Sequence, residues 1–198
     1  MTTTKGEKKK ERPLLGLQHG EASEIMNQKY DTSTPITEGL KERKGRSLSA
    51  KNGNDKVMTP KSLVKQIIGH FNPQGAILEP CRGTGNFWSE LPNADWCEID
   101  EGRDFMDAKG HWDWIITNPP YSKYRDFLNK SMEVADNIVF LQLINATFYK
   151  ARLRDIKEKG FGIKEIWCLE TPKEFPQFCF QVGCVHYQRG YKGNIIFN

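Results

Sequence analysis

The sequence lacks paired cysteines and long apolar runs, and both absences narrow the class of protein. None of its five cysteines belongs to a C-x-x-C pair, and an odd, scattered set is not typical of a disulfide framework. Its four histidines are isolated, so no zinc or triad spacing is present. The longest apolar stretches, such as "IVFL" at 138–141, are too short to span a bilayer. With no signal peptide visible, we expect a cytoplasmic protein without a metal site and without membrane contact.

Strong charge of one sign is also missing from most of the chain. The formal net charge is +4, but residues 1–50 hold ten Lys/Arg against seven Asp/Glu, and residues 51–198 hold nineteen against eighteen. Residues 1–50 show no hydrophobic period, which is typical of a disordered segment. We therefore predict a disordered basic tail over 1–50 and one folded domain over 51–198. The tail is either a solvated segment or a basic arm that contacts phosphates.

From residue 59 onward the hydrophobic pattern alternates between helix and strand. The stretch "TPKSLVKQIIGHF" predicts a helix with Thr59 as N-cap and Pro60 at its first position. Two further helices are predicted over 124–135 and 146–160. Apolar strands are predicted in the segments 75–80, 94–99, 112–117, 137–144 and 162–169.

Strands that alternate with helices indicate an α/β fold with a mostly parallel, doubly wound sheet. The segments 180–190 and 193–198 predict a closing antiparallel hairpin that turns at Lys192 and Gly193. Only five residues separate Ile99 from Phe105, whereas a parallel crossover needs a dozen or more. We therefore expect the third strand of such a sheet, the one that would directly follow the segment 94–99, to be missing or reduced.

A glycine turn follows the first predicted strand in "ILEPCRGTGNFW". Gly83 and Gly85 would let the backbone approach a small ligand where a Cβ atom would collide with it. A lone G-x-G is a weak signal, because many such pairs are ordinary tight turns. Glu79 at the strand end and Glu98 nineteen residues later strengthen it, since a carboxylate in that position reaches ribose hydroxyls in nucleoside-binding sheets.

A second unusual turn lies at the end of the strand in "DWIITNPPYSKYRDF", residues 113–127. Proline lacks an N–H and fixes its own φ, so two consecutive prolines end a strand abruptly. The turn also holds an amide side chain and an aromatic ring at the carboxyl edge of the sheet, where ligands bind in open α/β folds. A Pro-Pro pair by itself commonly only stiffens a loop.

The order of "TP" (59–60), "EPCRGTGNF" (79–87), "CEID" (97–100), "DF" (104–105) and "NPPY" (118–121) resembles S-adenosylmethionine-dependent amino-methyltransferases. It is most similar to small phage or bacterial adenine-specific DNA methyltransferases, over about residues 57–190. The resemblance implies a Rossmann-like class I methyltransferase fold, S-adenosylmethionine as cofactor and the 6-amino group of adenine in DNA as acceptor. Adenine in RNA, a glutamine amide in a protein, and a catalytically idle nucleic-acid-binding module are the alternatives.

The resemblance also implies a role for each matching residue. The catalytic residues would be Asn118, Pro119, Pro120 and Tyr121. The Asn118 side-chain oxygen and the Pro119 carbonyl would accept hydrogen bonds from the target amine, while Tyr121 would stack on the extruded base. Lys123 and Arg125, which follow this turn, would contact DNA phosphates.

For the cofactor, the resemblance implies contacts along the whole predicted crevice. The residues concerned are Thr59, Glu79, Pro80, Gly83, Gly85, Phe87, Glu98, Asp104 and Phe105. Glu79 and the glycine turn would flank the methionine part, with Thr59 near its carboxylate and Phe87 beside it. Glu98, or alternatively Asp100, would bind the ribose. Asp104 would bind the adenine amine of the cofactor, with Phe105 against its ring.

No gap between these motifs is long enough for a target-recognition domain, so specificity would be short and relaxed, or a partner or the tail would supply it. Deletion of residues 1–50 should therefore weaken DNA binding and flatten the slope of log affinity against log salt, because ten basic residues are lost. Fluorescence anisotropy over a salt series measures this, with cofactor affinity as the control. Equal affinity and slope in the truncated chain would identify the tail as idle.

Overall fold

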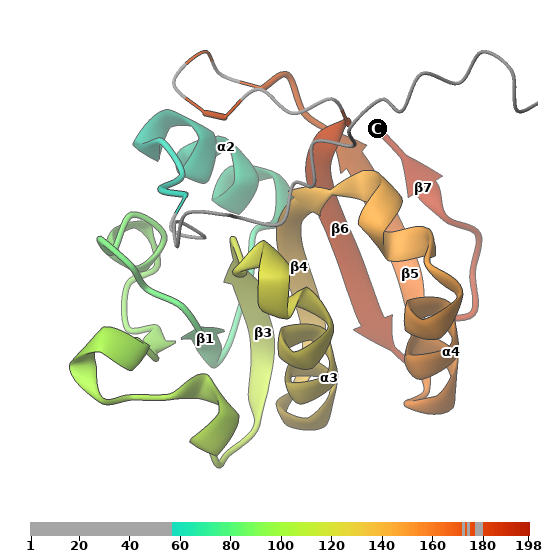
Figure 1. Cartoon of the computed structure of the whole chain (residues 1–198), viewed down its shortest axis with the longest axis horizontal. Helices are drawn as coiled ribbons and strands as arrows, with labels where there is room; N and C mark the ends of the chain where they lie inside the picture. Colours follow the sequence, from blue (N-terminus) through green and yellow to red (C-terminus); the bar gives the residue numbers. More distant parts are fainter. Residues whose placement is uncertain (1–56, 172, 174, 177–179) are drawn as a thin grey trace, which may run out of the picture. The chain divides into compact units, whose positions relative to one another are not determined.

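The structure is a computed structural model and describes residues 57–171, 173, 175–176 and 180–198. Within these residues seven strands form one sheet in the order β2-β1-β3-β4-β6-β5-β7 (Figure 1). The strands are β1 (Ile77–Glu79), β2 (Asp95–Trp96), β3 (Trp112–Thr117), β4 (Ala135–Leu143), β5 (Phe161–Cys168), β6 (Val182–Arg189) and β7 (Ile196–Phe197). The tail predicted over 1–50 lies outside the described residues.

The sheet is mostly parallel and carries an antiparallel hairpin near its C-terminal end. β1 pairs in parallel with β2 and β3, and β3 with β4, whereas β6 runs antiparallel between β4 and β5. The predicted fold class is thus confirmed, but the hairpin turning at Lys192 and Gly193 is wrong. β6 is already paired on both sides, so β7 passes beyond it and pairs in parallel with β5.

Helices cover both faces of the sheet, as the alternating strand residues require. Ile138 and Phe140 of β4 belong to the apolar cluster under α3 (Tyr124–Val134) and α4 (Lys150–Glu158). The intervening Val139 and Leu141 belong to the cluster under α2 (Lys61–Phe71), whose buried residues are Leu63, Val64 and Ile67. Successive strand side chains point to opposite faces, so one strand serves both clusters. No helix of the described residues has the length and apolarity to cross a membrane.

The start of α2 differs from the prediction. The helix begins at Lys61, Pro60 has the extended dihedrals φ −57° and ψ 141°, and no side chain caps the first turn. Thr59 is therefore not the N-cap. Its buried hydroxyl instead accepts a hydrogen bond from Asn118 Nδ2 at 3.2 Å, a partner 59 residues away that local sequence does not indicate.

The strand expected after residues 94–99, which would lie between β2 and β3 in the sequence, is absent from the described residues, as the short connection predicted. Between β2 and β3 the backbone forms two 3-10 turns, Ile99–Glu101 and Phe105–Asp107, and one isolated bridge between Glu98 and Arg103. Among the described strands β2 is therefore an edge of the sheet. β2 and β3 lie on opposite sides of β1, and such a reversal of strand order opens a crevice at the carboxyl ends of the strands.

Candidate active site

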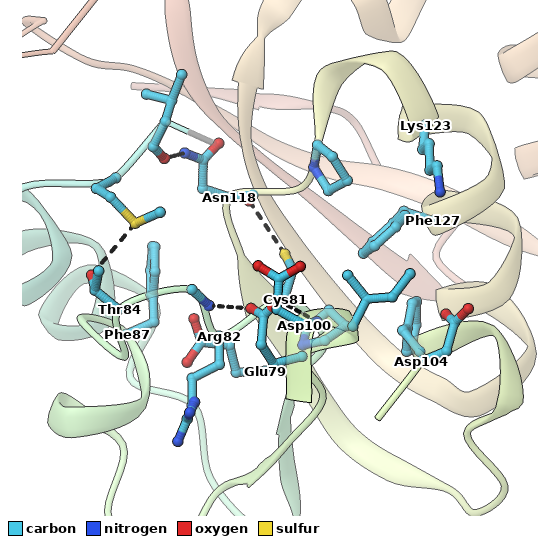
Figure 2. A pocket seen from close by; sticks show the side chains of 18 of the residues that line it. Glu79, Cys81, Arg82, Thr84, Phe87, Asp100, Asp104, Asn118, Lys123 and Phe127 are labelled. Atoms are coloured by element: carbon cyan, nitrogen blue, oxygen red, sulfur yellow. Dashed lines mark hydrogen bonds between the residues drawn. The ribbon is translucent and has the colours of Figure 1, made fainter. Parts of the chain in front are cut away.

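A pocket of about 710 Å³ lies at the carboxyl ends of β1 and β3 (Figure 2). Its lining comes from four segments of the chain, within 57–59, 79–87, 98–106 and 118–127. In Figure 2 the acidic residues Glu79, Asp100 and Asp104 lie below Asn118. This volume is in the range of small-molecule and cofactor sites, and the position matches the crevice that the strand order creates.

Asn118 directly follows β3, and its amide is held in one orientation. Nδ2 donates to the Val57 carbonyl oxygen at 2.9 Å and to the Thr59 hydroxyl at 3.2 Å. Because a carbonyl can only accept, these bonds assign the amide nitrogen and leave Oδ1 as the acceptor. Oδ1 is buried and has no hydrogen-bond partner among the described residues. A buried unsatisfied acceptor costs about 1–3 kcal/mol, so an N–H donor from a ligand would stabilise this arrangement.

The backbone carbonyls of the same turn are used unequally. The Asn118 carbonyl oxygen lies 3.3 Å from the Cys81 thiol, and the Pro120 carbonyl accepts from the Lys123 amide at 3.1 Å. Burial raises the pKa of the Cys81 thiol well above its usual range, so it remains protonated as a donor. The carbonyl of Pro119 accepts no hydrogen bond from the described residues. The turn thus holds two acceptors that receive no hydrogen bond from the described residues, Asn118 Oδ1 and the Pro119 carbonyl, and of these two residues only Asn118 lines the pocket.

Glu79 ends β1 and is 1% exposed. Burial raises the pKa of its carboxyl to about 8, while the Trp88 backbone N–H and the Arg82 charge partly oppose this. At neutral pH the side chain is therefore mostly protonated. Its Oε2 has no partner among the described residues. A cation entering the pocket would favour the ionised form and would provide the missing partner.

The glycine turn is tied to the end of β2 by Glu98. Gly83 has a φ of 53°, and its amide donates to Glu98 Oε2 at 2.6 Å. The Asp100 amide donates to the other carboxylate oxygen, Glu98 Oε1, at 3.3 Å. Gly85 lies outside the pocket lining. A Cβ on Gly85 would meet protein atoms only at 3.9 Å, so its φ of 82°, and not lack of space in the protein, demands glycine there.

The loop after β2 forms an acidic and partly apolar wall. Asp104 Oδ1 accepts from the Met106 amide at 2.9 Å, and Phe105 is buried against Phe127 with ring centroids 5.2 Å apart. Ile99 and Met106 line the pocket with 58% and 37% of their surfaces exposed. Residues 79–107, which include this loop, contain eight Asp/Glu and two Arg, a formal net charge of −6 when Glu79 is ionised. The wall therefore suits a cationic ligand with an apolar part.

The segment 57–59 crosses one side of the pocket and is held by three polar side chains. Besides Asn118, Asn86 Nδ2 donates to the Thr59 carbonyl at 2.9 Å, and the Thr84 hydroxyl donates to Met58 Sδ at 3.4 Å. Two of these contacts appear as dashed lines in Figure 2. Sequence reasoning identified Thr59 but missed Met58, Thr84 and Asn86. No periodic pattern marks them, because each acts through one contact with a distant segment.

Most of the residues expected at the site line the pocket. They are Thr59, Glu79, Pro80, Gly83, Phe87, Glu98, Asp104, Phe105, Asn118, Pro120 and Lys123. Those outside the lining are Gly85, Pro119, Tyr121 and Arg125. No group of His, Cys, Asp or Glu in the described residues could hold a metal ion.

Arg125 and Arg82 are both engaged by other parts of the protein. Arg125 forms two hydrogen bonds with Asp155, at 2.6 and 3.0 Å, and these link α3 to α4 and lower the pKa of the Asp155 carboxyl to about 2. Arg82 pairs with Glu101 and lies 4.0 Å from the centre of the Trp96 ring. Lys123, in contrast, has no ion-pair partner within the described chain.

No known family model matches the chain, and no curated protein matches its sequence. Solved structures do match its fold. A candidate class I S-adenosylmethionine-dependent methyltransferase from Listeria monocytogenes is 12% identical with a TM-score of 0.54, covering 71% of this chain and 64% of that one. The type I restriction enzyme EcoKI M protein is 14% identical with a TM-score of 0.53, covering 72% and 46%. The chain therefore has the Rossmann-like class I methyltransferase fold and spans under two thirds of either protein.

The raised pKa of Glu79 predicts a pH-dependent stability. Folded Glu79 keeps its proton up to about pH 8, whereas the unfolded residue releases it near 4.5, so folding loses stability as pH rises through this window. Glu79→Gln removes the titration. Its free energy of unfolding, relative to wild type, should rise by up to about 1.4 kcal/mol per pH unit between pH 5 and 8. Urea denaturation across this range measures the difference, and parallel curves would contradict the burial argument.

Proposed function

We propose that the chain binds S-adenosylmethionine in this pocket and transfers its methyl group to the exocyclic 6-amino group of adenine in DNA. One observation carries the proposal: the turn after β3 holds two acceptors, Asn118 Oδ1 at the pocket and the adjacent Pro119 carbonyl, that receive no hydrogen bond from the described residues. An exocyclic amine has two N–H groups, one for each acceptor. The fold shared with class I methyltransferases supports the same interpretation.

The pocket fits the cofactor in charge and in chemistry. S-adenosylmethionine carries a sulfonium and an ammonium group, and the formal net charge over residues 79–107, which reaches −6 when Glu79 ionises, would attract both. Glu79, with one carboxyl oxygen lacking a partner, would bind the ammonium group. Glu98 would accept from the ribose hydroxyls and Asp104 from the adenine amine. Exposed Ile99 would contact the adenine ring.

The chain's own residues would activate the acceptor amine. S-adenosylmethionine, when bound, supplies an electrophilic methyl group on a positively charged sulfur. The adenine amine is a poor nucleophile because its lone pair is delocalised into the ring. Asn118 Oδ1 and the Pro119 carbonyl would each accept one N–H, which favours a tetrahedral nitrogen with an available lone pair; one proton later leaves to water. The two prolines keep the acceptors in place, so little reorganisation accompanies the reaction.

Charge also favours a polyanionic acceptor next to the turn after β3. Residues 123–159 hold eight Lys/Arg against five Asp/Glu, a net charge of +3, and Lys123 and Asp126 of this range lie on the pocket lining. A target adenine must leave the double helix, at a cost of a few kcal/mol, before its amine can reach Asn118. Stacking on Tyr121 would offset about 1–3 kcal/mol of that cost. Arg125 would reach phosphates only by exchanging its bonds to Asp155.

A transfer assay with methyl-labelled cofactor tests the proposal directly. DNA, RNA and protein fractions are incubated separately with the chain, and the DNA is then digested to nucleosides. Labelled N6-methyladenine in the DNA fraction is the expected product. Label confined to RNA or to glutamine amides would keep the chemistry and replace the acceptor. Cofactor binding without transfer to any fraction would instead indicate an idle binding module.

The proposed role of Asn118 predicts a specific loss of turnover. Asn118→Ala should lower turnover by about 100- to 1,000-fold, as loss of one preorganised polar group at a reacting centre does. Cofactor affinity should change little, because Asn118 faces the acceptor. Single-turnover kinetics and calorimetry separate the two effects, with exposed Asn194→Ala as a matched control. A variant that loses cofactor binding but keeps its rate at saturation would reverse these roles.

Protonated Glu79 predicts that cofactor binding releases a proton. Because its carboxyl has a pKa of about 8, binding a cation below that pH requires ionisation. Affinity should therefore rise with pH between 6 and 7.5, by up to tenfold per unit. Calorimetry in buffers of different ionisation enthalpy counts the protons, and Glu79→Gln should bind weakly and release fewer. The same proton release from Glu79→Gln would exclude this carboxyl as its source.

A further inference from the structure

Tyr149, just before α4, is highly exposed, and a neighbouring arginine contacts its ring. Its side chain is 57% exposed, and the Arg152 guanidinium lies 4.9 Å from the centre of its ring. The same guanidinium lies 4.3 Å from the ring of Tyr124, which is 2% exposed, and donates to the Ala146 carbonyl. Cation–π contacts of this kind restrain an exposed ring. Tyr149 thus presents an open aromatic face on a buried support.

Tyr149 lies at the same end of the sheet as the pocket, where the parallel strands finish. β3 and β4 are parallel, so the turn after β3 and the 3-10 helix Ile144–Phe148 after β4 leave the sheet at the same end (Figure 1). Tyr124, which supports the stack, is the first residue of α3 and follows Pro120 by four positions. Tyr149 is therefore connected through one guanidinium to the helix that begins at the proposed catalytic turn.

The surroundings of Tyr149 are basic and partly apolar. Residues 144–159 contain five Lys/Arg and two Asp/Glu, a net charge of +3, whereas residues 57–198 as a whole have seventeen of each. Lys150 is exposed and has no ion pair with any other described residue. Phe148 and Leu153 are exposed by 46% and 39%. An aromatic face beside positive charge is the arrangement that binds single-stranded nucleic acid.

We propose that Tyr149 is a stacking site for an unpaired base of the DNA strand, separate from the pocket for the target adenine. The base would lie on the open face of the ring while Lys150 contacts its phosphate. The site rests on the proposed function for the choice of DNA, but not for the stacking geometry. An extruded adenine leaves neighbouring bases unstacked, and a second aromatic surface on the same edge would stabilise one of them.

The test measures binding of a 12-nucleotide single-stranded DNA to the full chain without cofactor, by fluorescence anisotropy. Tyr149→Ala should weaken binding about 5- to 150-fold, the range for loss of one stacked base. Tyr149→Phe should restore it, because the ring and not the hydroxyl makes the contact. Phe197→Ala is the matched control: Phe197 is 66% exposed on the edge strand β7 and has no cation–π contact with a described residue, so its loss should change nothing.

Several results would overturn the site. These are no detectable binding of the single strand, unchanged affinity in Tyr149→Ala, an equal loss in Phe197→Ala, or dependence on Tyr149 only with an RNA of the same sequence. Equal, Tyr149-dependent binding of a poly-glutamate peptide would assign the surface to acidic proteins instead. Transfer assays keep this test separate from the proposed function. If the single strand binds through Tyr149 but no methyl transfer is found, only the proposed function is refuted. If methyl transfer is found but Tyr149→Ala binds the single strand with unchanged affinity, only the stacking site is refuted.

Discussion

The hydrogen bond from Asn118 Nδ2 to the Val57 carbonyl, 2.9 Å long, joins segments 61 residues apart in the chain. It fixes the amide so that Oδ1 can only accept, and together with Thr59 it holds the segment before α2 across the pocket. The glycine turn contacts the same segment through Asn86. One amide thus connects the end of β3 to the start of the described chain, while Asn86 holds the same segment independently, and the proposed chemistry depends on the orientation of the Asn118 amide.

Charge is unevenly distributed along the chain. Residues 79–107 have a formal net charge of −6 when Glu79 is ionised, and residues 123–159, of which Lys123, Asp126 and Phe127 line the pocket, have +3. For the proposed function, this distribution would let a near-neutral chain attract both a cationic cofactor and a polyanionic acceptor. Buried Glu79 has a pKa of about 8, so its carboxyl is mostly neutral at neutral pH and would ionise when a cation binds beside it. This avoids the high cost of an unpaired buried charge.

The reduced sheet explains how a short chain retains a complete pocket. Where a third strand would lie, residues 97–111 form turns that carry Glu98, Ile99 and Asp104 to the crevice. Glu98 accepts a hydrogen bond from the Gly83 amide at 2.6 Å and thereby holds the glycine turn next to β2. Glu98 and Asp104 each also accept a hydrogen bond from a backbone N–H two residues ahead, which holds the loop without strand pairing. The loss of the strand therefore does not remove the wall of the site.

The sequence alone determined the fold class, the positions along the chain of the strands up to β4 and the two turns at which the pocket forms, because hydrophobic period and proline and glycine chemistry are local. It could not indicate that β7 pairs with β5, that Thr59 orients Asn118 and does not cap α2, or that Arg125 is bound to Asp155. Ile99 and Met58 also went unnoticed. Each of these depends on which distant groups meet, and only the packed tertiary structure decides which edge is left unpaired and which polar atom is left without a partner.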